Sequence, residues 1–170
     1  MKRPLVLIVD DEPVVLRALR VALEAQDYAV VATLSGEDAL ARITNGAFDL
    51  VLLDLGLPGL SGFEVISRVR VLFPTLPIIV LSAQGEDAVK VEALDLGADD
   101  YVSKPFSVRE LLARVRVALR HRDAASGRDS ATRLEHGQVE LDLAEHSARV
   151  RGDRIAVRRR GCCARSGRSA

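Results

Sequence analysis

Three aspartates follow two apolar runs of strand length, and together they could hold a metal ion beside a phosphate. Asp10 and Asp11 come directly after the run Leu5–Val9. Asp54 comes directly after a second run, Leu50–Leu53. The carboxyl ends of adjacent parallel strands meet at one edge of a sheet, so we expect the three carboxylates to lie close together. A small hard cation would relieve their repulsion, and Mg²⁺ suits such a site because it takes one or two carboxylates plus backbone oxygen and phosphate. The alternative is that Asp10 and Asp11 are an ordinary acidic start of a helix, favoured by the helix dipole.

A hydroxyl and an ammonium are expected at the same edge of the sheet. Ser82 closes the apolar run Ile78–Leu81, and Lys104 follows a short strand predicted at Asp100–Val102. A metal and a lysine beside a carboxylate can neutralise the charge that develops when a phosphoryl group passes to Asp54 and forms an aspartyl phosphate. Taken singly, Ser82 is also consistent with a plain strand-end hydroxyl and Lys104 with a solvated charge. Their joint placement favours the phosphoryl chemistry.

The elements that would position these residues alternate between strand and helix. Short apolar runs are separated by stretches of helical periodicity, which is typical of a parallel sheet covered by helices. The pattern predicts an α/β, doubly wound fold with its reactive groups at the carboxyl ends of the strands. The predicted strands are Leu5–Val9, Ala29–Thr33, Leu50–Leu53, Ile78–Leu81 and Asp100–Val102. The predicted helices cover approximately residues 13–25, 35–45, 63–72, 86–96 and 107–121.

Charge and composition narrow the class of protein. The 24 Lys and Arg residues balance the 24 Asp and Glu residues, which argues against a chain that is basic throughout, as nucleic-acid binders often are. The charges are unevenly spread, with 13 basic against 17 acidic residues up to His121 (net −4) and 11 against 7 from Arg122 onward (net +4). No apolar run approaches the roughly 20 residues of a membrane span, and the start lacks a signal-peptide cleavage site, so we expect a cytoplasmic protein with no membrane insertion. The adjacent Cys162 and Cys163 suit neither a disulfide framework nor a spaced zinc site.

Four segments in register connect residues 1–121 to a known family. They are Leu7–Pro13, Leu53–Gly59, Leu81–Ala83 and Gly97–Phe106. Together they resemble the receiver domain of two-component response regulators. The resemblance implies a flavodoxin-like five-stranded parallel sheet of strand order 2-1-3-4-5. It also implies a phosphoacceptor that catalyses its own phosphotransfer and dephosphorylation and is not otherwise an enzyme.

Residue by residue, the resemblance implies a phosphorylation site and a metal site. Asp54 would accept a phosphoryl group from a sensor histidine kinase. Asp10, Asp11, Asp54 and the backbone carbonyl of Gly56 would hold Mg²⁺. Lys104 would pair with an oxygen of the phosphoryl group.

The resemblance also implies a switch made of Ser82 and Tyr101. The hydroxyl would be drawn towards the new phosphate, and the aromatic ring would turn inward to fill the space that the hydroxyl leaves. A phosphate adds about −1.5 to −2 charge and three hydrogen-bond acceptors, which is enough to bias a packed side chain between two positions. Tyr101 is also consistent with an aromatic residue that covers the edge of the sheet.

Two segments, Gly97–Tyr101 and Glu110–Arg114, resemble the OmpR/PhoB class of these regulators. Receivers of this class form homodimers on phosphorylation, through the fourth helix, the fifth strand and the fifth helix. The residues at the positions of its intermolecular salt bridges are Lys90, Asp99, Asp100, Glu110 and Arg114. Exposed ion pairs contribute only about 0.2–1 kcal/mol each, so the alternative is a face that is merely solvated. Within the class, we expect this chain to be most similar to one particular regulator. That expectation rests on the segments Asp54–Pro58, Val80–Ala83 and Arg116–His121.

The family pattern is incomplete after residue 121. Residues 122–132 are small and polar and predict a linker, and residues 133–157 resemble the small sheet that opens the winged-helix DNA-binding domain of the class. Residues 158–170 are basic, without a helical pattern, and we expect them to be disordered. No recognition helix follows, so we predict no DNA-binding residues and infer a truncated or frameshifted reading. Non-specific phosphate contacts by the arginines from Arg154 onward are the alternative.

The sequence is therefore consistent with three hypotheses of function. The first is a phosphoacceptor of a two-component phosphorelay, which uses Mg²⁺ and switches a dimerisation face. The second is a sequence-specific transcriptional regulator, which the class predicts but the missing recognition helix opposes. The third is a hydrolase with an aspartyl-phosphate intermediate, which lacks any visible substrate pocket or cap domain in the sequence.

Overall fold

The computed structural model describes residues 3–83, 87–125, 133–136, 139–142, 147–150 and 153–156. The chain divides into two compact units, Met1–Arg122 and Asp123–Ala170, and each is described by itself. Residues 126–132 of the predicted linker lie outside the described residues. So does the predicted basic tail at residues 158–170, with both cysteines.

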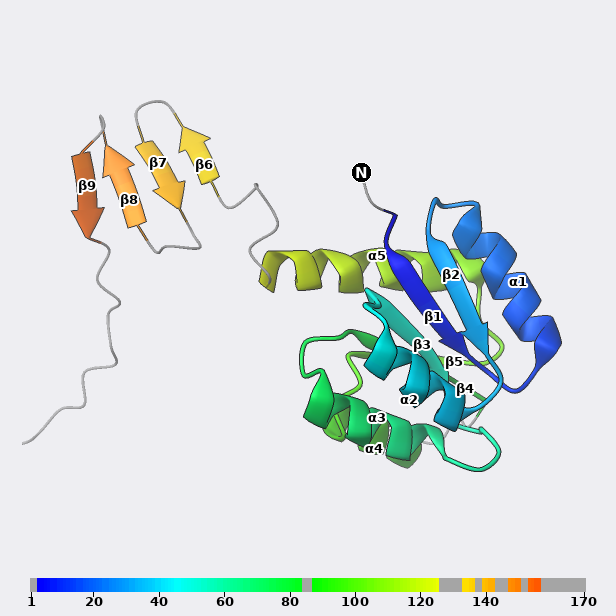
Figure 1. The fold of residues 1–170 in the computed structure, drawn as a ribbon. Helices are drawn as coiled ribbons and strands as arrows, with labels where there is room; N and C mark the ends of the chain where they lie inside the picture. Colours follow the sequence, from blue (N-terminus) through cyan, green and yellow to red (C-terminus); the bar gives the residue numbers. More distant parts are fainter. Residues whose placement is uncertain are drawn as a thin grey trace, which may run out of the picture. The chain divides into compact units, whose positions relative to one another are not determined.

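The first unit is a five-stranded parallel sheet with helices on both faces (Figure 1). The strand order is β2-β1-β3-β4-β5, which confirms the predicted order 2-1-3-4-5. The strands are β1 (Leu5–Val9), β2 (Ala29–Thr33), β3 (Leu50–Asp54), β4 (Ile78–Ser82) and β5 (Asp100–Ser103). The helices are α1 (Pro13–Glu24), α2 (Gly36–Asn45), α3 (Gly62–Leu72), α4 (Asp87–Asp95) and α5 (Val108–Ala125).

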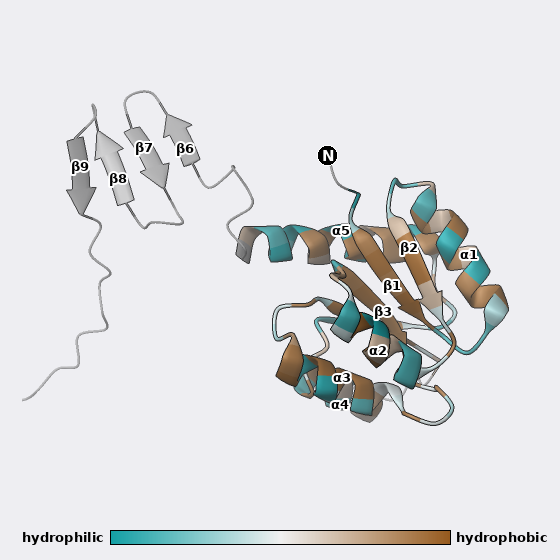
Figure 2. Ribbon diagram, in the orientation of Figure 1, coloured by the Kyte–Doolittle hydropathy of each residue, from teal (hydrophilic) through white to brown (hydrophobic). Residues whose placement is uncertain are grey.

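Two apolar layers pack on opposite faces of this sheet, because successive strand residues point to opposite faces. Val6 and Ile8 pack with residues of α1 and α5, whereas Leu7 and Val9 pack with residues of α2, α3 and α4. All residues of the central strand β3 are buried, as expected for a strand covered on both faces. Figure 2 shows β1, β2 and β3 as largely hydrophobic, while α1 and α2 alternate between hydrophobic and hydrophilic residues. Among the described helices, none is both long and apolar enough to cross a membrane.

Several elements extend beyond their predicted ends, because contacts between distant segments continue the local structure. Asp54 pairs with Leu81 in the β3–β4 ladder, so it is the last residue of β3. Helix α5 continues to Ala125, whereas the sequence predicts its end at residue 121. Arg122 in this last turn forms an ion pair with Asp49, which precedes β3. The first residues of the predicted linker are therefore helical.

The second unit is described only by its strands. They are β6 (Arg133–His136), β7 (Val139–Asp142), β8 (Ser147–Val150) and β9 (Asp153–Ala156). They form an antiparallel sheet in the order β6-β7-β8-β9. That this sheet, within residues 133–157, opens a winged-helix domain stays a prediction.

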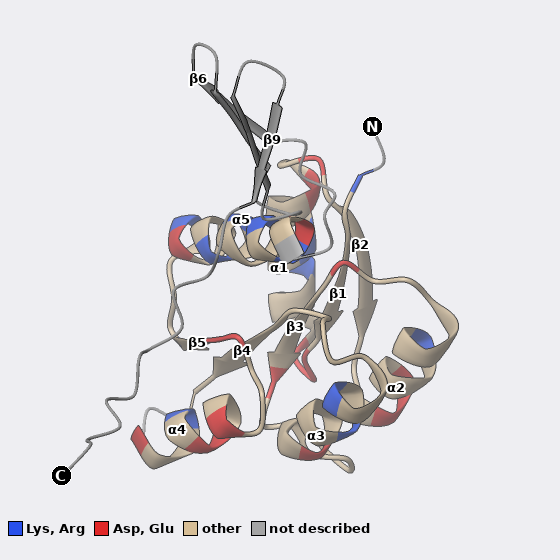
Figure 3. Cartoon of the chain, turned by 90° about the vertical axis from the view of Figure 1, so that its left-hand side faces the viewer, with Lys and Arg blue, Asp and Glu red and all other residues tan. Residues whose placement is uncertain are grey.

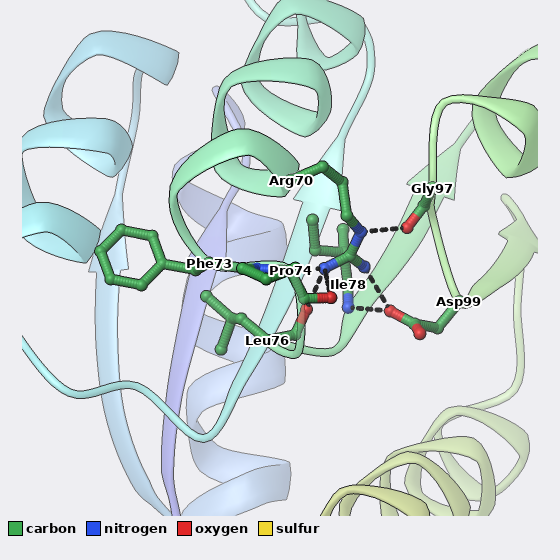
Figure 4. A network of polar contacts seen from close by, with 7 residues as sticks. All are labelled: Arg70, Phe73, Pro74, Leu76, Ile78, Gly97 and Asp99. Carbon is green, nitrogen blue, oxygen red and sulfur yellow. Dashed lines mark hydrogen bonds and ion pairs between the residues drawn. The ribbon is translucent and has the colours of Figure 1, made fainter.

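Arg70 of α3 connects two loops at the edge of the sheet where β4 and β5 begin (Figure 4). Its Nε donates to the carbonyl of Gly97 at 2.5 Å, and its Nη1 donates to the carbonyl of Leu76 at 2.6 Å. Its Nη2 reaches Asp99 Oδ2 at 2.6 Å, and the same oxygen accepts from the backbone amide of Ile78 at 2.7 Å. The Arg70 side chain is only 17% exposed. We call this group of contacts the Arg70 clamp.

We expect Arg70→Met to lower the free energy of unfolding by about 2–3 kcal/mol, because several hydrogen bonds to one charged group are lost and Asp99 loses its counter-ion. Urea unfolding of the wild type and the variant measures this difference. Arg70→Lys is the control, since lysine keeps the charge but lacks the planar fork of donors and should give an intermediate loss. A change below about 0.5 kcal/mol for Arg70→Met would show that the clamp does not support the fold.

Candidate functional site

The three predicted carboxylates lie together at one edge of the sheet. Asp10 and Asp11 follow β1, Asp54 ends β3, and these strands are neighbours. One carboxylate oxygen from each lies within 4.8 Å of the others. Asp10 is 0% and Asp54 7% exposed, whereas Asp11 is on the surface. Figure 3 shows acidic residues at this edge, where β1 and β3 end.

Lys104 brings a positive charge to this cluster. Its Nζ lies 2.7 Å from Asp10 Oδ2 and 2.5 Å from Asp54 Oδ2. Its backbone amide donates to the carbonyl of Ser82 at 2.7 Å, which fixes the start of the loop after β5. The peptide bond between Lys104 and Pro105 is cis. The predicted lysine therefore contacts both buried aspartates directly.

Two opposing effects act on the Lys104 ammonium. Burial lowers its pKa, but the hydrogen bonds and charges of Asp10 and Asp54 outweigh burial, so the pKa lies above its ordinary value. Lys104 is thus charged at neutral pH. One ammonium faces three carboxylates, so the cluster retains negative charge that can attract a cation.

The backbone also holds each buried carboxylate. Asp10 Oδ1 accepts from the amide of Glu12 at 2.9 Å. Asp54 Oδ1 accepts from the amide of Gly56 at 3.0 Å. Carboxylate oxygens on a half-open edge fit the ligand preference of a hard divalent cation, so the donor set could bind a metal. The part assigned to the Gly56 carbonyl stays a prediction.

The two predicted switch residues share one face of the sheet. Ser82 ends β4, and Tyr101 lies in β5 opposite Val80. Because Val80 and Ser82 are two residues apart, Ser82 points to the same side as Tyr101. Both side chains are buried, and Tyr101 belongs to the apolar layer under α2, α3 and α4. The structure thus places both residues on one face of the sheet, while the switch itself stays a prediction.

Most residues predicted for an intermolecular interface form ion pairs within their own chain. Arg114 Nη1 donates to both oxygens of Asp100, at 3.0 and 2.8 Å, and its Nη2 lies 2.9 Å from Glu110 Oε1. Asp99 belongs to the Arg70 clamp. Lys90 is exposed on α4. Sequence reasoning missed the partner of Asp99, because no local pattern indicates that Arg70 lies beside it.

Comparison with known families identifies the family to which the first unit is similar. Residues 6–116 match the family described as "Response regulator receiver domain". The chain is 46% identical over 140 residues to the transcriptional regulatory protein KdpE of Mycobacterium tuberculosis (strain ATCC 25618 / H37Rv), covering 82% of this chain and 61% of that protein. It is 40% identical over 152 residues to the sensory transduction protein RegX3 of the same strain, covering 89% of this chain and 66% of that protein. The chain thus spans about three fifths of the length of KdpE, and the likeness to KdpE predicted from the sequence is confirmed.

Solved structures agree with this match. A CheY-like receiver domain protein from Methanospirillum hungatei JF-1 has a TM-score of 0.71 at 30% identity, covering 73% of this chain and 99% of that one. A putative response regulator from Chloroflexus aurantiacus J-10-fl has a TM-score of 0.67 at 40% identity, covering 70% and 99%. A DrrB receiver domain described as activated by BeF3 has a TM-score of 0.66 at 34% identity, covering 70% and 99%.

The raised pKa of Lys104 predicts an alkaline limit to the stability of the fold. Below the ordinary pKa of 10.5 its ion pairs contribute fully, and the contribution is lost as the pH rises through the higher pKa of the folded state. We expect the free energy of unfolding to fall more steeply above pH 10.5 in the wild type than in Lys104→Met, which lacks this group. Urea unfolding at a series of alkaline pH values measures both slopes. Parallel slopes would show that Lys104 is not held by these carboxylates.

Proposed function

The chain belongs to the response regulator receiver domain family, and we propose that Asp54 is the residue that takes a phosphoryl group from a sensor histidine kinase. The observation that carries this proposal is the Lys104 ammonium between the carboxylates of Asp10 and Asp54. The matched family is described as a receiver domain, and Asp10, Asp11, Asp54 and Lys104 would act on a phosphoryl group that the chain itself accepts.

The chemistry follows from the placement of these groups. A carboxylate oxygen of Asp54 forms a bond to phosphorus while the bond from phosphorus to the kinase imidazole nitrogen breaks, and that nitrogen keeps the electron pair. Lys104 pairs with a phosphoryl oxygen, which offsets the negative charge gathered at the site. Buried Asp10 keeps the ammonium in position. The same groups support transfer from a small phosphodonor and later hydrolysis, so both steps are proposed to be self-catalysed.

The proposed metal is Mg²⁺, held by Asp10, Asp11, Asp54 and the carbonyl of Gly56. When bound, Mg²⁺ supplies positive charge next to the phosphoryl oxygens. Asp11 is the exposed member of the set, which suits an ion that keeps several of its waters. The proposal is supported by the donor set and by the charge that remains on the cluster.

The proposed switch links this site to Tyr101 in β5, which lies on the same face of the sheet as Ser82. Phosphate at Asp54 would draw the Ser82 hydroxyl, and Tyr101 would occupy the space beside it in the buried position that it has here. In the unphosphorylated protein the ring would also sample an outward position. A side chain with two packed positions allows a small movement at the site to change a distant surface.

The proposed output is a homodimer through α4, β5 and α5. This face exposes apolar side chains, with Val91 on α4 55% exposed and Val117 on α5 42% exposed. The ion pairs of Arg114 with Asp100 and Glu110 would exchange partners within the chain for partners across the interface. Such an exchange keeps the number of ion pairs constant, so the burial of apolar side chains would decide the equilibrium between monomer and dimer.

A second candidate function is transcription regulation. It is favoured by the relatives KdpE and YkoG, both described as transcriptional regulatory proteins, with the second from Bacillus subtilis (strain 168). For this chain, sequence-specific DNA binding is a proposal that rests on these relatives. A gel shift with promoter DNA and random DNA separates the two candidates, because only a sequence-specific regulator prefers the promoter.

We expect Asp54→Ala to abolish labelling by radioactive acetyl phosphate or by a phosphorylated histidine kinase, because the accepting oxygen is lost. Asp11→Asn should keep the acceptor but label at least about tenfold more slowly at limiting Mg²⁺, because it replaces a charged metal ligand with a neutral one. Asp95→Ala, at an exposed position on α4, is the control and should label like the wild type. Labelling that survives Asp54→Ala would overturn the assignment.

We expect beryllofluoride with Mg²⁺, a mimic of the phosphoryl group, to convert the protein from monomer to dimer in sedimentation. Lys90→Glu reverses a charge on α4 and should weaken the dimer by about fivefold, which is about 1 kcal/mol. Arg68→Glu makes the same change on an exposed position of α3 and should leave the dimer intact. Equal sedimentation with and without beryllofluoride would contradict the proposed dimer.

A further inference from the structure

The loop that connects β3 to α3 carries Gly56 and is fixed at its first residues. The amide of Gly56 donates to Asp54 Oδ1 at 3.0 Å, and the amide of Gly62 donates to the carbonyl of Leu55 at 3.3 Å. Leu55, like Leu57 and Leu60 further along, is buried against the core. These contacts hold Gly56 beside Asp54, and contacts at the far end of the loop add a further restraint.

Glu37, in the first turn of α2, holds the far end of the same loop. Its Oε1 accepts from the backbone amide of Leu60 at 2.9 Å, across 23 residues of sequence. An acidic side chain in the first turn of a helix is favoured by the helix dipole, so the carboxylate is stabilised where the loop needs an acceptor. Glu37 is exposed, so its contribution comes from this contact and not from packing in the core.

Two glycines allow α2 and the loop to approach this closely. A Cβ on Gly59, whose φ is +78°, would lie 2.7 Å from Glu37 Oε1. A Cβ on Gly36 would lie 2.6 Å from the carbonyl oxygen of Leu60. A larger residue at Gly36 would push the loop away from α2, and one at Gly59 would displace the Glu37 carboxylate. The contact between Glu37 and Leu60 is therefore built by both segments.

Resting on the proposed function, we infer that Glu37 is a positioning residue for the metal and phosphoacceptor site. By holding the amide of Leu60, it restrains a segment in which Gly56 and Gly59 would otherwise move easily. The restraint keeps the backbone of Gly56 in the position from which its amide binds Asp54 and its carbonyl would bind Mg²⁺. Glu37 touches neither the metal ligands nor the phosphoryl group, so it acts only through the loop.

The test compares Glu37→Ala with Glu37→Gln. Alanine removes the acceptor, whereas the amide oxygen of glutamine can still accept from Leu60. We expect Glu37→Ala to weaken Mg²⁺ binding by about tenfold in titration calorimetry, in the range seen when indirect supports of a metal site are removed. Glu37→Gln should stay within about twofold of the wild type, because the hydrogen bond and not the charge carries the effect. Glu24→Ala, which removes an exposed acid from α1, is the control.

Amide hydrogen exchange in the metal-free protein gives a second, independent readout. The Leu60 amide should exchange at least about tenfold faster in Glu37→Ala than in the wild type and in Glu37→Gln, while amides of β1 and β3 keep their protection. Faster exchange throughout the sheet would mark a general loss of structure and overturn the inference. Equal Mg²⁺ affinities of the wild type and Glu37→Ala would also overturn it. So would an equal loss of Mg²⁺ affinity in Glu37→Ala and Glu37→Gln. Absence of Mg²⁺ binding by the wild type would instead overturn the proposed function on which the inference rests, and the Leu60 exchange rates would still show whether Glu37 holds the loop.

Discussion

Two buried carboxylates share one ammonium in this protein, and the sheet and loops of the first unit hold these three groups together. Asp10 and Asp54 lie at the ends of adjacent strands, and Lys104 reaches them from the end of β5. Buried like charges repel strongly and are tolerated only where a counter-charge and hydrogen bonds compensate them. The sheet order brings β1 and β3 together, and the backbone amides of Glu12 and Gly56 hold the remaining oxygens. The compensation is incomplete because of Asp11, and this incompleteness makes the site attractive to a cation.

The two edges of the sheet differ in how their polar groups are satisfied. At the edge where β4 and β5 begin, Arg70 donates to two loops and to Asp99, and Asp99 in turn accepts from Ile78 (Figure 4). At the opposite edge, Lys104 binds Asp10 and Asp54, whereas Asp11 is exposed. The polar groups at the first edge are thus bonded within the protein, whereas the second edge keeps one exposed carboxylate.

Charged residues of β5 and α5 that pair within the chain could also pair between two copies of the chain. Asp100, Glu110 and Arg114 form a connected group within the chain, although the sequence resemblance assigns them to an interface. Exposed ion pairs contribute little each, so exchanging one partner for another requires little free energy. Pairs of this kind can stabilise the monomer and still be available to a second copy of the chain. Asp99 differs, because it is also bonded to the start of β4 through the amide of Ile78.

The sequence alone determines the alternation of strands and helices, because apolar periodicity is a local property that packing on both faces of a sheet requires. It also places Asp10, Asp54 and Lys104 at strand ends, so a shared site follows once the strands are taken as parallel neighbours. The tertiary structure alone decides which polar groups meet across long separations, as between Glu37 and Leu60 or between Arg70 and Asp99. It likewise extends α5 past residue 121, where Arg122 finds Asp49. The physical reason is that many arginines and acids along the chain have the same local pattern, and only the folded backbone brings a particular donor within reach of a particular acceptor.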